Sequence, residues 1–129
     1  MSLFQFFMLL CSVESGHDAT REGGFGELGP AQISAIMVED FNRITGKSLE
    51  HKDVVSFSVS WMVFHTVIRH YEKLDYCDYL NPDQMMAVAK FWNGGPSWRR
   101  SGFEKTERLR SYWEKVQTAI GGQTVLQSA

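Results

Sequence analysis

Five apolar segments, separated by polar or glycine-rich stretches, organise the sequence: residues 3–13, 33–44, 54–71, 85–92 and 109–120. In the last four, apolar residues recur at the three- and four-residue spacing of one helix face. Residues 54–71 are apolar around most of the circumference, so we expect them to form the central helix. Residues 3–13 are apolar at nearly every position, which indicates a helix buried on most sides. The pattern therefore predicts a mainly α-helical fold.

Several helix ends are marked by particular residues. Asn81 is followed by a proline and then by Gln84, which is typical of a capped helix start. Gly46 is placed to end the second helix, and a glycine pair, residues 121–122, is placed to end the last one, which we expect to begin near Thr106. The chain is thus predicted to form one domain over residues 1–122, followed by a flexible C-terminal tail over residues 123–129.

Composition and charge narrow the class of protein. The 129 residues are 43% hydrophobic, which is typical of a globular protein with a single core. A net charge of −2 provides no broad basic field, so we do not expect nucleic acid as a partner. No apolar run approaches the roughly 20 residues of a membrane span. His65 and His70 do not share a helix face as a ligand pair would, and no metal site is expected.

The cysteines and the N-terminal segment bear on the cellular compartment. Cys11 and Cys77 could pair in an oxidising compartment, but Cys11 lies in an apolar segment where a buried thiol acts as a small hydrophobe, so we favour two free thiols. Residues 3–13 have the length of a signal-peptide core. They lack a preceding cationic residue and a following small-x-small cleavage site, so we expect a helix of the mature protein and no export signal.

Glu14 stands at the end of the first apolar segment, and a glycine-dense loop follows it. A carboxylate partly withdrawn from water has its ionised form disfavoured, which raises its pKa and suits it to be a general acid. The loop glycines, Gly23, Gly24, Gly26 and Gly29, allow the backbone to approach a ligand closely. Glu14 is therefore a candidate catalytic acid beside a cleft. The alternative is a solvated residue at a helix end.

Three short motifs occur in an order that is characteristic of one superfamily. They are Glu14-Ser15 with Gly26-Glu27-Leu28-Gly29-Pro30-Ala31-Gln32-Ile33, then Phe91-Trp92-Asn93-Gly94-Gly95-Pro96, and finally Tyr112-Trp113-Glu114-Lys115-Val116. Together they resemble the lysozyme-like superfamily, and within it the lytic transglycosylases related to goose-type lysozyme. The departures from the family pattern are Glu27, Pro30, Ala31 and Trp92, the last of which replaces a tyrosine. The resemblance implies a lysozyme-like α+β fold in which a small glycine-rich loop or hairpin forms one wall of a cleft.

The resemblance also implies a substrate, the β-1,4 bond between N-acetylmuramic acid and N-acetylglucosamine in peptidoglycan glycan strands. In a lytic transglycosylase, Glu14 would donate a proton to the leaving oxygen and then accept one from the muramic C6 hydroxyl, closing a 1,6-anhydro ring. A hydrolytic muramidase would need a second carboxylate, for which Glu22 and Glu27 are candidates ahead of Asp18. A catalytically inactive module that binds cell-wall glycan is a third reading. The expected location is periplasmic or extracellular, or phage-delivered; no cofactor is implied, and the oligomeric state stays open.

Supporting roles are implied by position within the family motifs. Ser15 is expected to orient Glu14, Gln32 to hydrogen-bond an N-acetyl group, and Tyr112 to position either the acid or the substituent at the cleavage point. Trp92 offers a ring for sugar stacking and an indole N–H where the family has a hydroxyl. The substrate-binding candidates are thus Ser15, Gln32, Trp92, Asn93, Gly94 and Tyr112.

Overall fold

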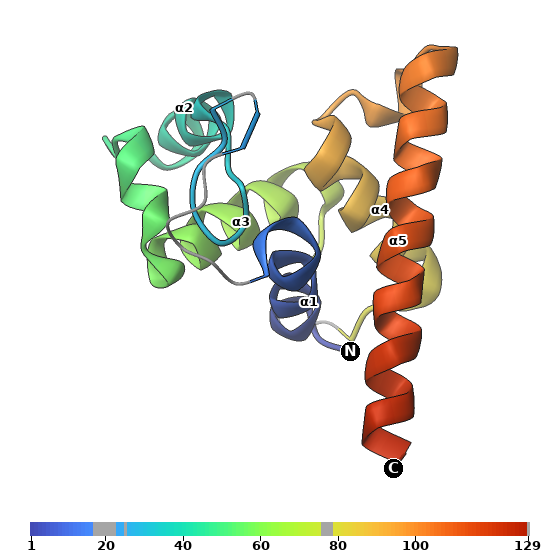
Figure 1. The fold of residues 1–129 in the computed structure, drawn as a ribbon. Coiled ribbons are helices and arrows are strands. Elements are labelled where there is room, and N and C mark those ends of the chain that lie inside the picture. Colours follow the sequence, from blue (N-terminus) through green and yellow to red (C-terminus); the bar gives the residue numbers. More distant parts are fainter. Residues whose placement is uncertain (17–22, 25, 76–78, 129) are drawn as a thin grey trace.

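The computed structural model describes residues 1–16, 23–24, 26–75 and 79–128, which form five α-helices and two short 3-10 helices (Figure 1). In chain order they are α1 (Leu3–Ser15), α2 (Ala35–Thr45), η1 (His51–Val55), α3 (Phe57–Glu72), α4 (Pro82–Gly94), η2 (Trp98–Arg100) and α5 (Phe103–Ser128). The predicted mainly α-helical class is confirmed. Pairing between extended segments is confined, in this part of the chain, to two isolated bridges, Ser2 with Tyr79 and Leu28 with Ile33. The lysozyme-like assignment stays a prediction.

Helix α1 is the buried helix that the first apolar segment predicted. Ser2 caps its start, accepting a hydrogen bond from the Gln5 backbone N–H, while the Gln5 side chain accepts one from the Ser2 backbone N–H. Gly16 ends the helix in a left-handed conformation that glycine adopts without steric cost. The helix packs against both α3 and α5. Its last turn therefore holds Glu14 between the core and the solvent.

Helix α3 crosses the middle of the molecule and supplies much of the core. Phe64 on α3 is fully buried and lies 4.8 Å, ring centroid to ring centroid, from Phe7 of α1. The helix begins at Phe57, later than the apolar pattern suggested, because Ser56 caps it by accepting from the Val59 N–H. Val54, where the pattern began, lies in η1.

Helix α2 confirms one predicted end and corrects the other. Gly46 ends it in the left-handed conformation, as expected. Its first residue is Ala35, with Ser34 as the cap, whereas the apolar pattern placed Ile33 at the start of the helix. Ile33 is instead buried in the bridge to Leu28, and Ile36 is 76% exposed rather than part of the core face. The apolar periodicity of this segment therefore includes both a buried residue, Ile33, and a surface residue, Ile36.

The capping box predicted at Asn81 is present, since Asn81 and Gln84 exchange hydrogen bonds at the start of α4. The last helix differs from its prediction. Helix α5 begins at Phe103 and continues through Gly121 and Gly122 to Ser128, so the predicted stop at these glycines is wrong and residues 123–128 are helical. Glycine lowers helix propensity by about 1 kcal/mol but ends a helix efficiently only in a left-handed cap, and neither of these glycines has a positive φ.

Helix α5 packs along α4 and α1, and its C-terminal part extends beyond the other helices (Figure 1). Among the described residues, none of the helices combines the length and apolarity needed to cross a membrane. Cys11 is buried in α1 as a free thiol, and Cys77 lies outside the described residues.

Candidate active site

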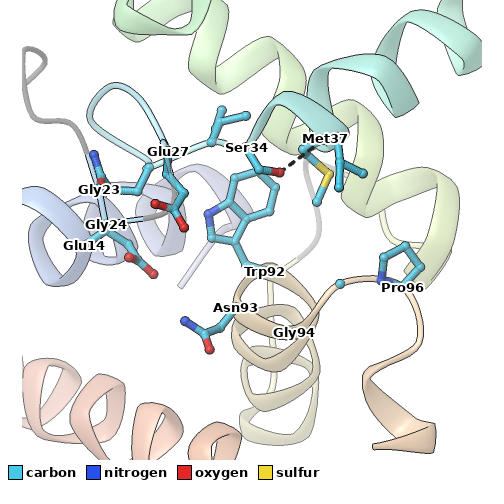
Figure 2. A pocket seen from close by; sticks show the side chains of 14 residues that line it. Glu14, Gly23, Gly24, Glu27, Ser34, Met37, Trp92, Asn93, Gly94 and Pro96 are labelled. Carbon is cyan, nitrogen blue, oxygen red and sulfur yellow. Dashed lines mark hydrogen bonds between the residues drawn. The ribbon is translucent and has the colours of Figure 1, made fainter. Parts of the chain in front are cut away.

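A pocket of about 480 Å³ opens between the loop that follows α1 and the end of α4. Its lining comes from the last turn of α1, the glycine loop, the start of α2 and the turn after α4 (Figure 2). The lining includes six predicted site residues from separate parts of the chain: Glu14, Glu27, Gln32, Trp92, Asn93 and Gly94. The fold therefore brings the first two sequence motifs to one cleft.

Tyr112 of the third motif reaches the same place from α5. Its hydroxyl donates a hydrogen bond to Glu14 Oε1 over 2.6 Å, across 98 residues of sequence. Tyr112 is buried, with only 9% of its surface exposed, whereas Glu14 is half-buried and lines the pocket. The tyrosine thus fixes one carboxylate oxygen from the core side. Its role in catalysis stays a prediction.

Two buried groups beside Glu14, Tyr112 and Cys11, have raised pKa values, first because of burial and second because of the Glu14 charge. Burial raises the pKa of the Tyr112 phenol far above its ordinary value, and the nearby charge of Glu14 raises it further. Burial also raises the pKa of the Cys11 thiol to about 12, with a smaller contribution from Glu14. Both groups are therefore neutral hydrogen-bearing partners behind the carboxylate at any physiological pH.

Residues 28–33 of the glycine loop form a compact turn. Leu28 and Ile33 exchange two backbone hydrogen bonds of 3.0 and 2.9 Å around residues 29–32. Gly29 has a φ of +81° and lies against η1, so close that an added Cβ would come within 2.2 Å of the Val54 carbonyl oxygen. The loop is thus docked on η1 at a position that only glycine can occupy.

Two supports of this loop were missed by the sequence reasoning. The His51 ring contacts the Ile33 carbonyl oxygen through Nε2 at 2.7 Å. Ser60 of α3, which is fully buried, donates to the Val54 carbonyl oxygen. The sequence pattern of residues 47–52 predicts an ordinary loop. It does not indicate that His51 contacts a carbonyl oxygen 18 residues earlier in the chain.

Within the loop, Gly23, Glu27 and Gln32 converge. An added Cβ at Gly23 would come within 2.2 Å of Glu27 Oε2 and 2.6 Å of Gln32 Oε1, so the glycine gives room for both side chains. The Gln32 amide also donates to the Gly29 carbonyl oxygen over 3.0 Å, and Gln32 itself has a φ of +51°. Glu27 and Gln32 are therefore held on one wall of the pocket, and Figure 2 shows the Glu27 and Glu14 carboxylates on the same side of Trp92.

The opposite wall is formed by the end of α4. The Trp92 indole N–H donates to the Ala31 carbonyl oxygen over 3.1 Å, and its ring packs at 4.5 Å against Phe64. The N–H predicted to face a sugar is therefore engaged by the loop, and the ring is what Trp92 offers to the pocket. Asn93 also lines the pocket, and its side chain projects away from α4 (Figure 2).

Gly94 lines the pocket and also lets α5 approach. An added Cβ there would come within 3.0 Å of both Leu109 methyl carbons and 3.2 Å of Trp98 Cβ. A larger residue at this position would therefore require Leu109 or Trp98 to shift, whatever its contact with a ligand. The sequence alone does not distinguish a glycine that serves packing from one that contacts a ligand.

Ser15 does not have the position that its motif predicted. It is buried, and its hydroxyl is within donor distance of two carbonyl oxygens, that of Cys11 at 3.1 Å and that of Pro30 at 2.7 Å. The serine thus ties the end of α1 to the glycine loop. It does not line the pocket. Glu22 and Asp18, the other acidic candidates, lie outside the described residues.

The start of α2 contributes three lining residues that the predicted site did not include: Ser34, Ile36 and Met37. Ser34 caps α2 by accepting from the Met37 N–H over 3.2 Å (Figure 2). The exposure of Ile36 could have identified this wall, but that exposure is known only from the structure.

No group of three His, Cys, Asp or Glu side chains in the described ranges is arranged to hold a metal ion.

No protein-family model matches the sequence, and neither the curated proteins nor the solved structures contain a match.

Proposed function

We propose that the protein cleaves the β-1,4 bond between N-acetylmuramic acid and N-acetylglucosamine in peptidoglycan, with Glu14 as the general acid and base of a lytic transglycosylase. The observation that carries the proposal is the Glu14 carboxylate, which lines a pocket of about 480 Å³ and is held by the Tyr112 hydroxyl at 2.6 Å. Cleaving a glycoside requires a proton for a poor leaving oxygen, and a half-buried carboxyl group beside an open pocket suits that task.

The proposed reaction needs one proton carrier. Tyr112 donates to Glu14 Oε1 and so orients the carboxyl group that carries the proton. Protonated Glu14 donates to the glycosidic oxygen, the bond from that oxygen to muramic C1 breaks, and the N-acetylglucosamine end leaves as an alcohol. Ionised Glu14 then takes the proton of the muramic C6 hydroxyl, and the C6 oxygen bonds to C1. The product is a 1,6-anhydro ring, and Glu14 is protonated again.

The pocket walls supply contacts that suit an N-acetylated sugar. The Trp92 ring, whose N–H is engaged by Ala31, presents an apolar surface for a sugar face. The Asn93 and Gln32 amides line the same pocket and can each donate and accept hydrogen bonds with an N-acetyl group or a hydroxyl. This substrate implies action in the periplasm or outside the cell, or delivery by a phage.

A hydrolytic muramidase is the second candidate, and one observation favours it. Glu27 lines the same pocket as Glu14, and its carboxylate is held against Gly23 beside Gln32. A second carboxylate of this kind activates a water molecule in inverting glycosidases. In that reaction Glu14 would again donate the proton, and Glu27 would take one from water.

Mass spectrometry of the products from purified peptidoglycan tests the proposal. We expect muropeptides that end in 1,6-anhydro-N-acetylmuramic acid, in amounts that Glu27→Gln leaves within about threefold. Reducing ends, lost in Glu27→Gln, would instead establish the hydrolase. Intact sacculi after prolonged incubation with folded protein would overturn both and leave an inactive glycan-binding module.

A further inference from the structure

The cleft does not end at the pocket beside Glu14. A second hollow of about 400 Å³ adjoins it, and the two share Ile36, Met37 and Pro96 as lining residues. The second hollow is lined by residues of α2, by Tyr71 near the end of α3 and by Pro96. Figure 2 shows Met37 and Pro96, which both pockets share, on the far side of Trp92 from Glu14. A branched ligand that occupies the first pocket can therefore continue into the second without leaving the protein surface.

A fixed cation lies in this second hollow. Arg43 Nη2 forms an ion pair with Asp40 and donates to the Tyr71 hydroxyl over 2.7 Å. The Tyr71 hydroxyl in turn donates to Asp40 Oδ1 over 3.0 Å, which closes a three-membered network. The Asp40 side chain is 15% exposed, whereas that of Arg43 is 61% exposed. The network holds the guanidinium in place without covering it.

The network leaves donors available to a ligand. Arginine carries five N–H donors, and the contacts to Asp40 and Tyr71 both use Nη2. The Nε and Nη1 atoms have no hydrogen-bond acceptor among the described residues. A carboxylate that meets a pre-oriented guanidinium forms a charge-assisted hydrogen bond, which is stronger than a neutral one. The free donors of Arg43 therefore suit an anionic group.

The remaining walls define the kind of molecule that would carry that anion. Ile36, Met37 and Pro96 provide an apolar approach from the first pocket. Two carboxylates also line the hollow: that of Asp40, which is paired with Arg43, and that of Glu39, which would repel a polyanion but accept an ammonium group. A short peptide, with aliphatic side chains and charged ends, matches this combination of an apolar approach, one guanidinium and the carboxylate of Glu39.

We propose that the second hollow is a specificity subsite that binds the carboxylate-bearing peptide branch of the glycan strand, with Arg43 as its anchor. The inference rests on the proposed function, because that function places a muramic sugar, which bears the branch, in the adjoining pocket. Asp40 and Tyr71 act as positioning residues for Arg43. The subsite makes peptide-bearing strands better substrates than stripped ones.

Cleavage of two substrates tests the subsite. The ratio of kcat/KM for peptide-bearing strands to that for strands stripped of peptide by an amidase is expected to be about ten, which corresponds to 1.4 kcal/mol. Arg43→Gln should bring the ratio to about one, and Arg43→Lys should keep part of it. Arg110→Gln is the matched control, since Arg110 also pairs with carboxylates but lies on α5, and it should keep the full ratio. A wild-type ratio of one, or an unchanged ratio in Arg43→Gln, would overturn the proposal.

Direct binding separates this proposal from the proposed function. Calorimetric titration with an N-acetylmuramyl tetrapeptide should give binding that weakens about tenfold when the carboxylates of the ligand are amidated, and also in Arg43→Gln. That result, with no cleavage of either strand, would refute the enzyme and retain the subsite. Equal binding of the two ligands would refute the subsite even if both strands are cleaved.

Discussion

At the scale of single residues, the proposed chemistry depends on how the Glu14 carboxylate is held in place. Glu14 lies half-buried at the end of an apolar helix, and Tyr112 donates to one of its oxygens. The tyrosine is neutral at every accessible pH, because burial and the Glu14 charge raise its pKa. It is therefore a permanent donor to Glu14 and cannot itself be the base of the reaction.

Removing this donor should impair cleavage without unfolding the protein. In Tyr112→Phe we expect kcat/KM on peptidoglycan to fall by roughly ten- to a hundredfold, since a hydrogen bond to a charged group is worth about 1.5–3 kcal/mol. The alkaline limb of the pH–rate profile should move to higher pH, because the ionised carboxylate loses a stabilising donor and Glu14 keeps its proton to a higher pH. Tyr79→Phe, at a side chain that is 79% exposed, is the control. An unshifted profile with full activity would remove Tyr112 from the site.

His65 provides a pH-dependent contribution to stability. Its pKa is lowered, first by burial and second by the charge of Arg69, and its ring lies 4.8 Å from that of Trp61. Below its ordinary value of 6.5, the unfolded chain binds the proton more tightly than the folded one, so stability falls as the pH drops through that value. The unfolding free energy, measured with urea at several values between pH 5 and 7.5, should change less with pH in His65→Gln than in the wild type. Equal slopes would show that His65 titrates normally in the folded protein.

At the scale of elements, the glycine loop and its neighbours form the cleft wall. The loop is closed by the bridge between Leu28 and Ile33, tied to α1 through Ser15 and docked on η1 through Gly29. These contacts come from three elements, so the wall is a tertiary structure and its local sequence specifies only part of it.

Two glycines of this loop allow the docking contact to be isolated. Gly26 and Gly29 have φ values of +80° and +81°, but an added Cβ meets nothing within 4 Å at Gly26 and the Val54 carbonyl oxygen at Gly29. Gly26→Ala should cost about 1 kcal/mol of unfolding free energy, for the left-handed backbone alone. Gly29→Ala should cost about 3 kcal/mol, because it adds a steric conflict. Equal costs, measured by urea unfolding, would mean that the loop is not docked on η1.

The same distinction between local and tertiary contacts separates the features that the sequence predicts from those that it does not. Element ends that depend on local chemistry, such as Gly46 and the box of Asn81 and Gln84, were predictable from spacing. The end of α5 was not, because Gly121 and Gly122 remain helical. Ile36 was misplaced because periodicity identifies an apolar position without saying whether core or cleft faces it.

At the scale of the whole molecule, the fold assembles one cleft from segments far apart in sequence. Motif order indicated that Glu14, Gln32 and Asn93 belong together, and all three line one pocket. The motifs did not indicate that Ser15 would turn inward to Pro30, or that the Trp92 N–H would be engaged by Ala31. Such partners are set by the packing of α1, α4 and the loop, which no local spacing encodes.

The central claim is that Glu14 transfers the proton. The most direct measurement is the rate at which soluble muropeptides are released from purified peptidoglycan by Glu14→Gln, with Glu104→Gln as a control for an exposed glutamate that lines neither pocket. The account predicts a fall of at least a hundredfold for Glu14→Gln, in the range expected for loss of a general acid, with thermal unfolding of the variant still cooperative. Release by folded Glu14→Gln at the wild-type rate would contradict the account.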